Sequence, residues 1–183
     1  AIKTHAVKDG DDYVINGSKM WITSGTQADW MCMLANTDNV AKNKHLNKSL
    51  ICVPLKENGK RVKGVTINRK LKKMGMHSSD TAEIFFEDVR VPQSYLVGEE
   101  GKGFVYQMMQ FQEERLYAAI ANYTSCELAI NQTIDYTRQR KTFGKPILDN
   151  QVVHFKLAEL MTEVEALKAL TWKGIDIHVN GGD

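Results

Sequence analysis

The chain has 183 residues, of which 43% are hydrophobic, and a formal net charge of +2. This size and apolar content are enough to bury a core, as one domain or as two small ones. The near balance of charges argues against a general polyanion binder. No run of about 18 apolar residues predicts a membrane span, and the first residues lack the basic and then apolar plan of a signal peptide, so a soluble protein is expected.

The cysteines and histidines point to no metal centre. The three cysteines are widely spaced, without a Cys-x-x-Cys pair, which favours reduced thiols in an intracellular compartment. The five histidines are equally scattered, so no metal site is expected.

Up to residue 97 the chain has the pattern of short strands joined by polar turns. Asn16-Gly17 is a two-residue turn signal between strand-forming runs at 12–15 and 19–25, and it predicts a β-hairpin. Further short strands are expected at 30–35, 49–54, 64–67 and 82–86, and the polar segment 36–48 is expected to be an exposed loop. This spacing predicts a small antiparallel β-sandwich or barrel.

A lysine-rich run at 56–73 allows two interpretations. It could be a nucleic-acid patch, or a strand with one solvated, charged face. It contains no aromatic residue for base stacking, and its valines and isoleucine alternate as in a strand. We therefore favour the strand and expect no nucleic-acid partner.

After residue 97 the pattern becomes helical. From Phe104 to Arg140 there is no proline or glycine, and apolar residues recur at helical spacing. A second helix is expected from about Asn150 to Val179, ended by an Asn-Gly-Gly run. The fold class is thus α+β, with a small β-domain at 1–97 followed at 98–183 by long antiparallel helices of a helical bundle.

The segment Arg-Lys-Thr-Phe-Gly-Lys-Pro-Ile at 140–147 is the most informative part of the helical half. Basic residues gather where the first helix ends, and Gly144 and Pro146 stop it. Guanidinium and hydroxyl groups both suit phosphate oxygens. The segment therefore predicts a site for a phosphate-bearing ligand.

Several short stretches, taken together, resemble the acyl-CoA dehydrogenase family. In chain order they are Lys-Met-Trp-Ile-Thr-Ser-Gly at 19–25, Met-Gly-Met at 74–76, Ser-Asp-Thr at 79–81, Phe-Glu-Asp-Val-Arg-Val-Pro at 86–92, Gly-Lys-Gly-Phe at 101–104, Gln-Glu-Glu-Arg-Leu at 112–116 and Arg-Lys-Thr-Phe-Gly-Lys at 140–145. The resemblance implies that the chain is the middle β-domain and the first part of the C-terminal helical domain of a longer family member.

The resemblance also implies FAD as the cofactor, because no side chain can accept the hydride that this chemistry removes. Trp21, Ile22 and Thr23 match positions that lie against the flavin ring. The positions that match contacts to the rest of the cofactor are Arg140, Thr142, Phe143, Asn150 and Gln151. In the family the first of these contacts come from a neighbouring subunit, which implies a homo-oligomer, typically a homotetramer.

For the catalytic base the resemblance points to Glu114, followed by Arg115 as in the long-chain and isovaleryl-type enzymes. Glu113 and Glu114 lie roughly 100° apart on a helix, so they cannot both face one cleft. Glu113 is nearer the large apolar stripe, whereas Glu114 shares a face with small residues where a ligand can approach. Two alternatives stay open, a base on a later segment, as in most of the family, and ordinary surface glutamates.

The remaining implications concern substrate and partners. Gln112, Glu113 and Arg115 match the stretch that lines the acyl-CoA site. The expected reaction is α,β-dehydrogenation of an acyl-CoA in fatty acid β-oxidation, with electrons passed to an electron-transferring flavoprotein. The location would be the mitochondrial matrix in a eukaryote or the cytoplasm in a bacterium. A non-catalytic relative that acts in binding or assembly is the alternative.

Overall fold

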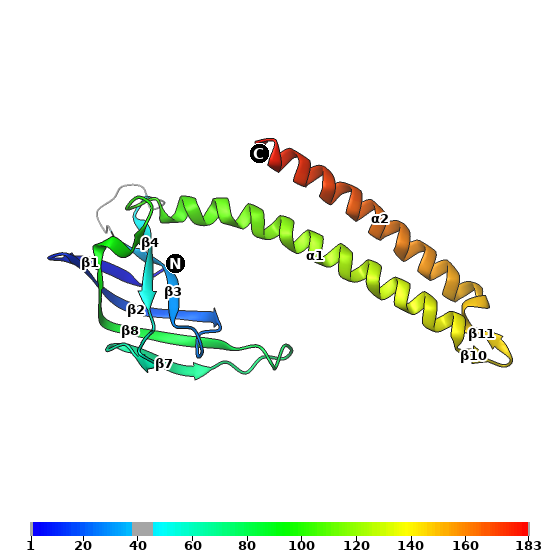
Figure 1. Cartoon of the computed structure of the whole chain (residues 1–183), viewed down its shortest axis with the longest axis horizontal. Helices are drawn as coiled ribbons and strands as arrows, with labels where there is room; N and C mark the ends of the chain where they lie inside the picture. The colour runs from blue at the N-terminus through cyan, green and yellow to red at the C-terminus, as the bar shows by residue number, and fades with distance from the viewer. Residues whose placement is uncertain (1, 38–45, 183) are drawn as a thin grey trace. The chain divides into compact units, whose positions relative to one another are not determined.

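A computed structural model describes residues 2–37 and 46–182 (Figure 1). Most of the predicted loop at 36–48 therefore lies outside the described residues. The chain divides into two compact units, Ala1–Met108 and Met109–Asp183, and the boundary falls inside helix α1, Gly103–Gln139. The domain boundary expected from the sequence lies earlier, between residues 97 and 98, and it stays a prediction.

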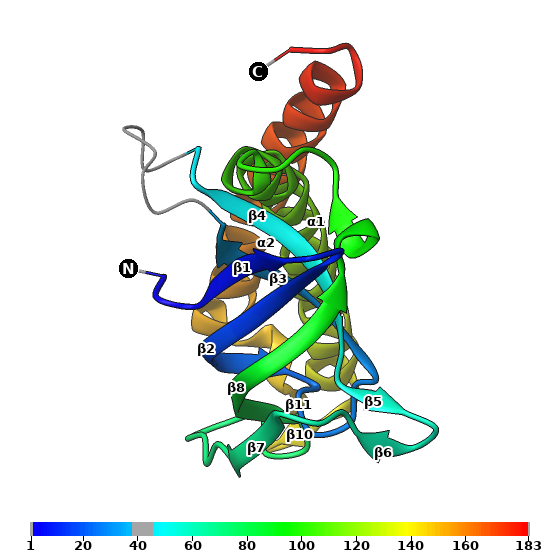
Figure 2. The same cartoon turned by 90° about the vertical axis from the view of Figure 1, so that its left-hand side faces the viewer.

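The first unit is built on a seven-stranded sheet in the order β7-β8-β2-β1-β3-β4-β9 (Figure 2). The strands are β1 His5–Asp9, β2 Asp12–Thr23, β3 Trp30–Asn36, β4 Lys48–Pro54, β7 Val65–Lys70, β8 Thr81–Pro92 and β9 Leu96–Val97. A separate two-stranded ribbon pairs β5, Lys56–Glu57, with β6, Lys60–Arg61. A short 3-10 helix, η1, spans Gln93–Tyr95.

The pairings are antiparallel except between β1 and β3, which are parallel at His5 and Asn36. The α+β class is confirmed. The sheet is open, with β7 and β9 at its edges, so the term barrel describes it only loosely. The lysine-rich run predicted as a strand contributes β5, β6 and β7.

Alternating residues of the central strands form one apolar core. Its fully buried members include Tyr13, Ile15, Met33, Ile51, Val53, Ile84, Val89 and Val91. Side chains alternate between the two faces of a strand, so the residues between these members point away from the core.

The hairpin predicted at Asn16-Gly17 is wrong, because β2 runs straight through these residues. The turn lies earlier, at Gly10, whose φ of 61° suits a tight turn, and it brings Asp9 opposite Asp12. Asn16 instead marks a bulge. Its side-chain Nδ2 donates to Asp88 Oδ1 at 3.0 Å, and its Oδ1 accepts the Asp88 N–H at 2.9 Å.

The second unit is an antiparallel pair of helices, as predicted. Helix α2 spans Gln151–Val179, and the short strands β10, Lys141–Thr142, and β11, Lys145–Pro146, connect it to α1 with the 3-10 helix η2, Ile147–Asp149. Ile130 of α1 packs with Leu157 and Val164 of α2. None of the described helices has an apolar stretch long enough to span a bilayer.

Candidate functional site

A second bulge in β2 decides which way Trp21 faces. Met20 and Trp21 together lie opposite the single residue Glu83 of β8. An extra residue reverses the alternation of the strand. Ile15 points into the core before the bulge and Ile22 packs against the core after it. Trp21 is thereby left on the outside, although it is an odd-numbered residue like Ile15.

Trp21 combines backbone strain with an exposed ring. Its φ is 63° and its exposed fraction is 65%. A bulky residue in this region of backbone conformation costs about 1–3 kcal/mol, and such outliers concentrate at ligand sites. Thr23, two residues on, is exposed as well. The exposed indole of Trp21 and the exposed hydroxyl of Thr23 together suit a ligand that has a flat ring with polar groups at its edge.

Asp80 supports the turn that follows Trp21. Its backbone carbonyl accepts the Ser24 N–H at 2.9 Å, and its carboxylate Oδ2 accepts the Thr26 N–H at 2.8 Å. Arg61 holds the same turn from the other side, with Nη2 donating to the Thr26 carbonyl at 2.6 Å. Gly25, which lies between Ser24 and Thr26 in this turn, is buried, and a Cβ atom at this position would lie 2.8 Å from the Cβ atom of Ala82.

The electrostatics of Asp80 fit this supporting role. Burial raises the pKa of its carboxyl, but hydrogen bonds from Thr26 and Gln27 and the charge of Lys70 outweigh burial and hold the pKa below the usual value. Asp80 Oδ1 and Arg61 Nη1 are buried and have no hydrogen-bond partner among the described residues. Neither residue has a role that the sequence predicts, although Asp80 lies within the Ser-Asp-Thr stretch at 79–81.

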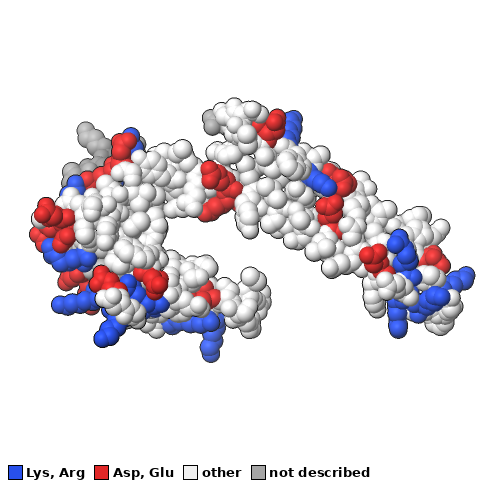
Figure 3. All heavy atoms as spheres, in the orientation of Figure 1, with Lys and Arg blue, Asp and Glu red and all other residues white. Residues whose placement is uncertain are grey.

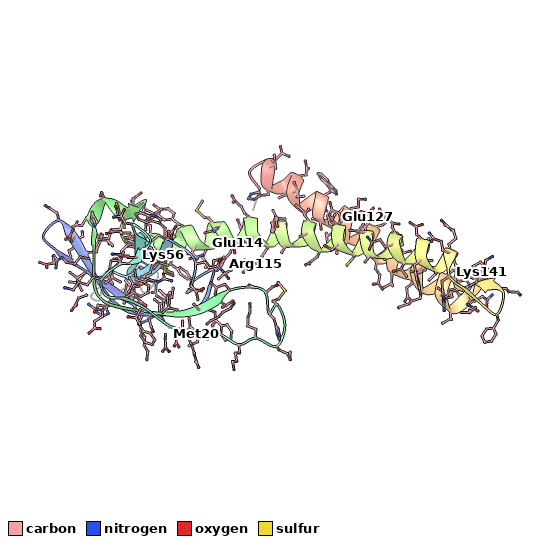
Figure 4. The ribbon with its side chains drawn as sticks, turned by 60° about the horizontal axis from the view of Figure 1, so that its bottom comes forward. Met20, Lys56, Glu114, Arg115, Glu127 and Lys141 are labelled. Carbon is pink, nitrogen blue, oxygen red and sulfur yellow. The ribbon has the colours of Figure 1, made fainter. Side chains whose placement is uncertain are left out.

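Glu114 and its neighbours lie on the exposed surface of α1 (Figure 4). Glu114 Oε1 accepts a hydrogen bond from Gln110 Nε2 at 3.0 Å, one turn earlier. Leu116 faces α2, with its Cδ2 3.4 Å from the place that a Cβ on Gly174 would occupy. Because Glu114 is about 160° around the helix from Leu116, it lies on the face that α2 leaves uncovered.

The other residues predicted to bind substrate do not all share that face. Gln112 and Arg115 line a pocket of about 320 Å³ in the helical unit, together with Leu116, Gly174, Ile177, His178 and Gly182. Glu113 and Glu114 are not among its lining residues. The Arg115 guanidinium also lies over the Phe111 ring, 5.7 Å from its centroid. The structure thus brings Gln112 and Arg115 together and keeps Glu114 apart from them.

The segment at 140–147 forms an ordered hairpin directly after α1. Lys141 pairs with Pro146 and Thr142 with Lys145. The turn residues Phe143 and Gly144 have φ values of 51° and 80°. Glycine accepts such a value without cost, whereas phenylalanine does not. Phe143 nevertheless occupies the tip, with its side chain fully exposed.

Many basic residues lie near this hairpin, with acidic side chains between them (Figure 3). Lysine and arginine side chains gather at the hairpin end of the helical unit (Figure 3), where the sequence places Arg138, Arg140, Lys141 and Lys145. Lys141 is marked at this end in Figure 4. An exposed aromatic ring among cations suits a ligand that has both phosphate groups and a flat ring.

Asn150 and Gln151 follow at the start of α2, where backbone N–H groups and the helix dipole favour an anion. Both side chains are exposed. Asn150 Nδ2 donates to the Ile147 carbonyl at 2.9 Å, so this side chain holds the connection between the hairpin and the helix.

Comparisons with known proteins assign both units to one family. Family models for the acyl-CoA dehydrogenase middle and C-terminal domains match residues 1–89 and 101–183. The long-chain specific acyl-CoA dehydrogenase of Rattus norvegicus is 42% identical over 97% of this chain, and the cyclohex-1-ene-1-carbonyl-CoA dehydrogenase of Syntrophus aciditrophicus is 40% identical over 94%.

The solved structures agree. The crystal structure of an acyl-CoA dehydrogenase from Geobacillus kaustophilus aligns with a TM-score of 0.88 and 43% identity, over 100% of this chain and 47% of that one. The chain spans 40% of the length of each of the two relatives named above.

Proposed function

The chain belongs to the acyl-CoA dehydrogenase family, and from that premise we propose that it forms part of an FAD-dependent enzyme that dehydrogenates the α,β bond of an acyl-CoA thioester. The observation that carries this proposal is the exposed Trp21 ring, held at a φ of 63° by the bulge in β2. Backbone strain of this kind persists where the surrounding structure enforces it, and it is common at ligand sites. A flat cofactor that lies against the indole would account for the strain at Trp21.

The residues of this chain fit FAD in two places. Trp21 and Thr23 offer an exposed aromatic ring and a hydroxyl for the flavin ring, and Ile22, whose side chain packs against the core, would contribute its backbone. The hairpin offers Arg140, Thr142 and Phe143 for the pyrophosphate and adenosine, with Asn150 and Gln151 at the adjoining helix start. When bound, FAD supplies the hydride acceptor that side chains lack.

We assign Glu114 as the base that removes the α-proton of the thioester. A carboxylate suits this task because it accepts the proton as the Cα–H bond breaks. Glu114 lies on the face of α1 left free by α2, and Gln110 Nε2 holds one of its oxygens at 3.0 Å. Gln112, Glu113 and Arg115 are the proposed contacts to the acyl-CoA; the pocket that Gln112 and Arg115 line does not include Glu114, so it is not itself the place where the base would act.

The proposed assembly follows from the hairpin. If its residues reach the FAD of a neighbouring subunit, each active site needs two copies of the protein, and we propose a homotetramer. An electron-transferring flavoprotein is the proposed electron acceptor. We propose the mitochondrial matrix as the location in a eukaryote, as in the rat relative's name, or the cytoplasm in a bacterium.

The test is the Glu114→Gln variant, with Glu159→Gln as its matched control, because Glu159 is an exposed glutamate on α2 with no proposed role. Purified protein is incubated with FAD, and its visible absorption is followed during anaerobic addition of a panel of acyl-CoA thioesters. We expect Glu114→Gln to retain flavin but to lose bleaching by at least about a thousandfold in rate, because the base is absent. The control should bleach at a rate close to that of the unchanged protein.

Two outcomes would contradict the proposal. Unchanged bleaching by Glu114→Gln would show that the base lies elsewhere. Flavin that stays oxidised with every thioester, even in the unchanged protein, would favour the non-catalytic alternative, a binding or assembly role.

A further inference from the structure

Cys32 and Cys52 face each other across two neighbouring strands. Cys32 lies in β3 and Cys52 in β4, and the register of this antiparallel pair places them directly opposite. The adjacent residue Met33 is fully buried, whereas Cys32 is exposed and Cys52 is half-buried. The two thiols therefore occupy the outer face of the sheet, where small molecules have access.

The hydrogen bonds at the ends of the two strands identify the kind of pair. The Leu55 N–H donates to the Asp29 carbonyl at 2.7 Å, and the Thr37 N–H donates to the Asn47 carbonyl at 3.0 Å. Hydrogen-bonded and non-hydrogen-bonded pairs alternate along an antiparallel ladder. Position 32 is an odd number of residues from both 29 and 37, so the cysteines form a non-hydrogen-bonded pair.

This class of pair brings side chains closest together. Its Cα atoms are about 4.5 Å apart, which lies within the span of about 4.4–6.8 Å that a disulfide bridges. The neighbouring Cys52 thiol also affects the electrostatics of Cys32. Burial, and then the neighbouring Cys52, raise the pKa of the Cys32 thiol above its usual value. The two thiols can therefore form a disulfide without movement of the strands.

We propose that Cys32 and Cys52 form a redox-active dithiol that closes to a cross-strand disulfide by exchange with a low-molecular-weight disulfide such as oxidised glutathione. The exposed Cys32 loses its proton and attacks the small disulfide, which forms a mixed disulfide and releases one small thiolate. Cys52 then loses its proton and attacks the Cys32 sulfur, which releases the second small thiolate. The protein gives up two protons and two electrons, and the small disulfide becomes two thiols.

The test treats the protein with oxidised glutathione and identifies the products by mass spectrometry of the intact protein and of tryptic peptides. Lys48 separates the two cysteines in the sequence, so trypsin places them in different peptides. We expect a peptide pair joined through Cys32 and Cys52, and one free thiol, on Cys126. The rate should rise about tenfold per pH unit near neutrality, because thiolate is the nucleophile and the Cys32 pKa is raised.

Two variants and a second probe decide the outcome. Cys52→Ser should stop at the mixed disulfide on Cys32, whereas Cys126→Ser should close as the unchanged protein does. A trivalent arsenical, which binds two nearby thiols without oxidation, should be retained at one equivalent by the unchanged protein and by Cys126→Ser. We expect Cys32→Ser to retain none of the arsenical. Two results would overturn the proposal: a mixed disulfide in the unchanged protein that does not proceed to the Cys32–Cys52 disulfide, or arsenical binding that does not depend on Cys32.

Discussion

Replacement of Asp80 should loosen the turn that follows Trp21. In Asp80→Ala the Thr26 N–H loses its 2.8 Å hydrogen bond to the carboxylate, while the Ser24 N–H keeps its bond to the Asp80 backbone carbonyl. A hydrogen bond to a charged group contributes about 1.5–3 kcal/mol. Since Asp80 is only 6% exposed, little water can replace the lost acceptor. We expect Asp80→Ala to lower the free energy of unfolding by about 2–3 kcal/mol.

Asp80→Asn is the matched control, because its amide oxygen can still accept the Thr26 N–H. Charge-assisted hydrogen bonds are roughly twice as strong as neutral ones, so this variant should lose only about 1 kcal/mol. Urea denaturation followed by circular dichroism gives both values. Amide hydrogen exchange gives the local result, in which Asp80→Ala loses protection at Thr26 and keeps it at Ser24. Equal stability of the two variants, or unchanged protection at Thr26, would refute this reasoning.

The same carboxylate makes a defined contribution to the pH dependence of stability. The pKa of Asp80 is lowered in the folded state, so its charge stabilises the fold at pH values above its ordinary pKa of 3.8. That contribution is lost as the pH falls through the lowered folded pKa. The stability difference between the unchanged protein and Asp80→Asn should therefore shrink on acidification below about pH 4. A constant difference would show that the charge has no part in it.

Three further substitutions test backbone strain. Gly17→Ala should lower the free energy of unfolding, measured by urea denaturation, by about 2–3 kcal/mol, because the new Cβ would lie 2.7 Å from Thr4 Cα at a φ of 133°. Gly10→Ala is the control, because its new Cβ would meet nothing within 4 Å. This variant should lower the free energy of unfolding by only about 1 kcal/mol. Phe143→Gly should keep or raise stability, since it removes the strained φ of 51°, yet weaken FAD binding roughly tenfold by spectroscopic titration. Tight FAD binding by this variant would argue against a cofactor contact at the hairpin tip.

The long elements were predictable from the sequence because their signals are local. The absence of glycine and proline after Phe104 predicted α1 to within a residue at each end, and the Asn-Gly-Gly run marked the end of α2. The strands followed from short strand-forming runs separated by polar connections. In these segments the local preference and the tertiary packing agree.

The two bulges were not predictable, because each depends on a partner distant in the chain. Asn16-Gly17 has the local signature of a turn, yet the hydrogen bonds of Asn16 go to Asp88, 72 residues away. Likewise, simple alternation from Ile15 would place Trp21 in the core, and only the pairing with β8 reveals that it faces outward. The roles of Trp21 and Glu114 came from resemblance to the family and stay predictions.

The bulges of β2 and β8 also restrict how the lengths of these strands can change. One bulge gives β8 an extra residue opposite Asn16, and the other gives β2 an extra residue opposite Glu83. Both strands therefore use 12 residues between the end pairs Asp12–Pro92 and Thr23–Thr81. Deleting the extra residue at either bulge would remove that bulge and leave both end pairs in place, whereas a deletion elsewhere in either strand would shift the pairing of the residues between it and a bulge. Single deletions in β2 and β8 should accordingly be tolerated best at the two bulges.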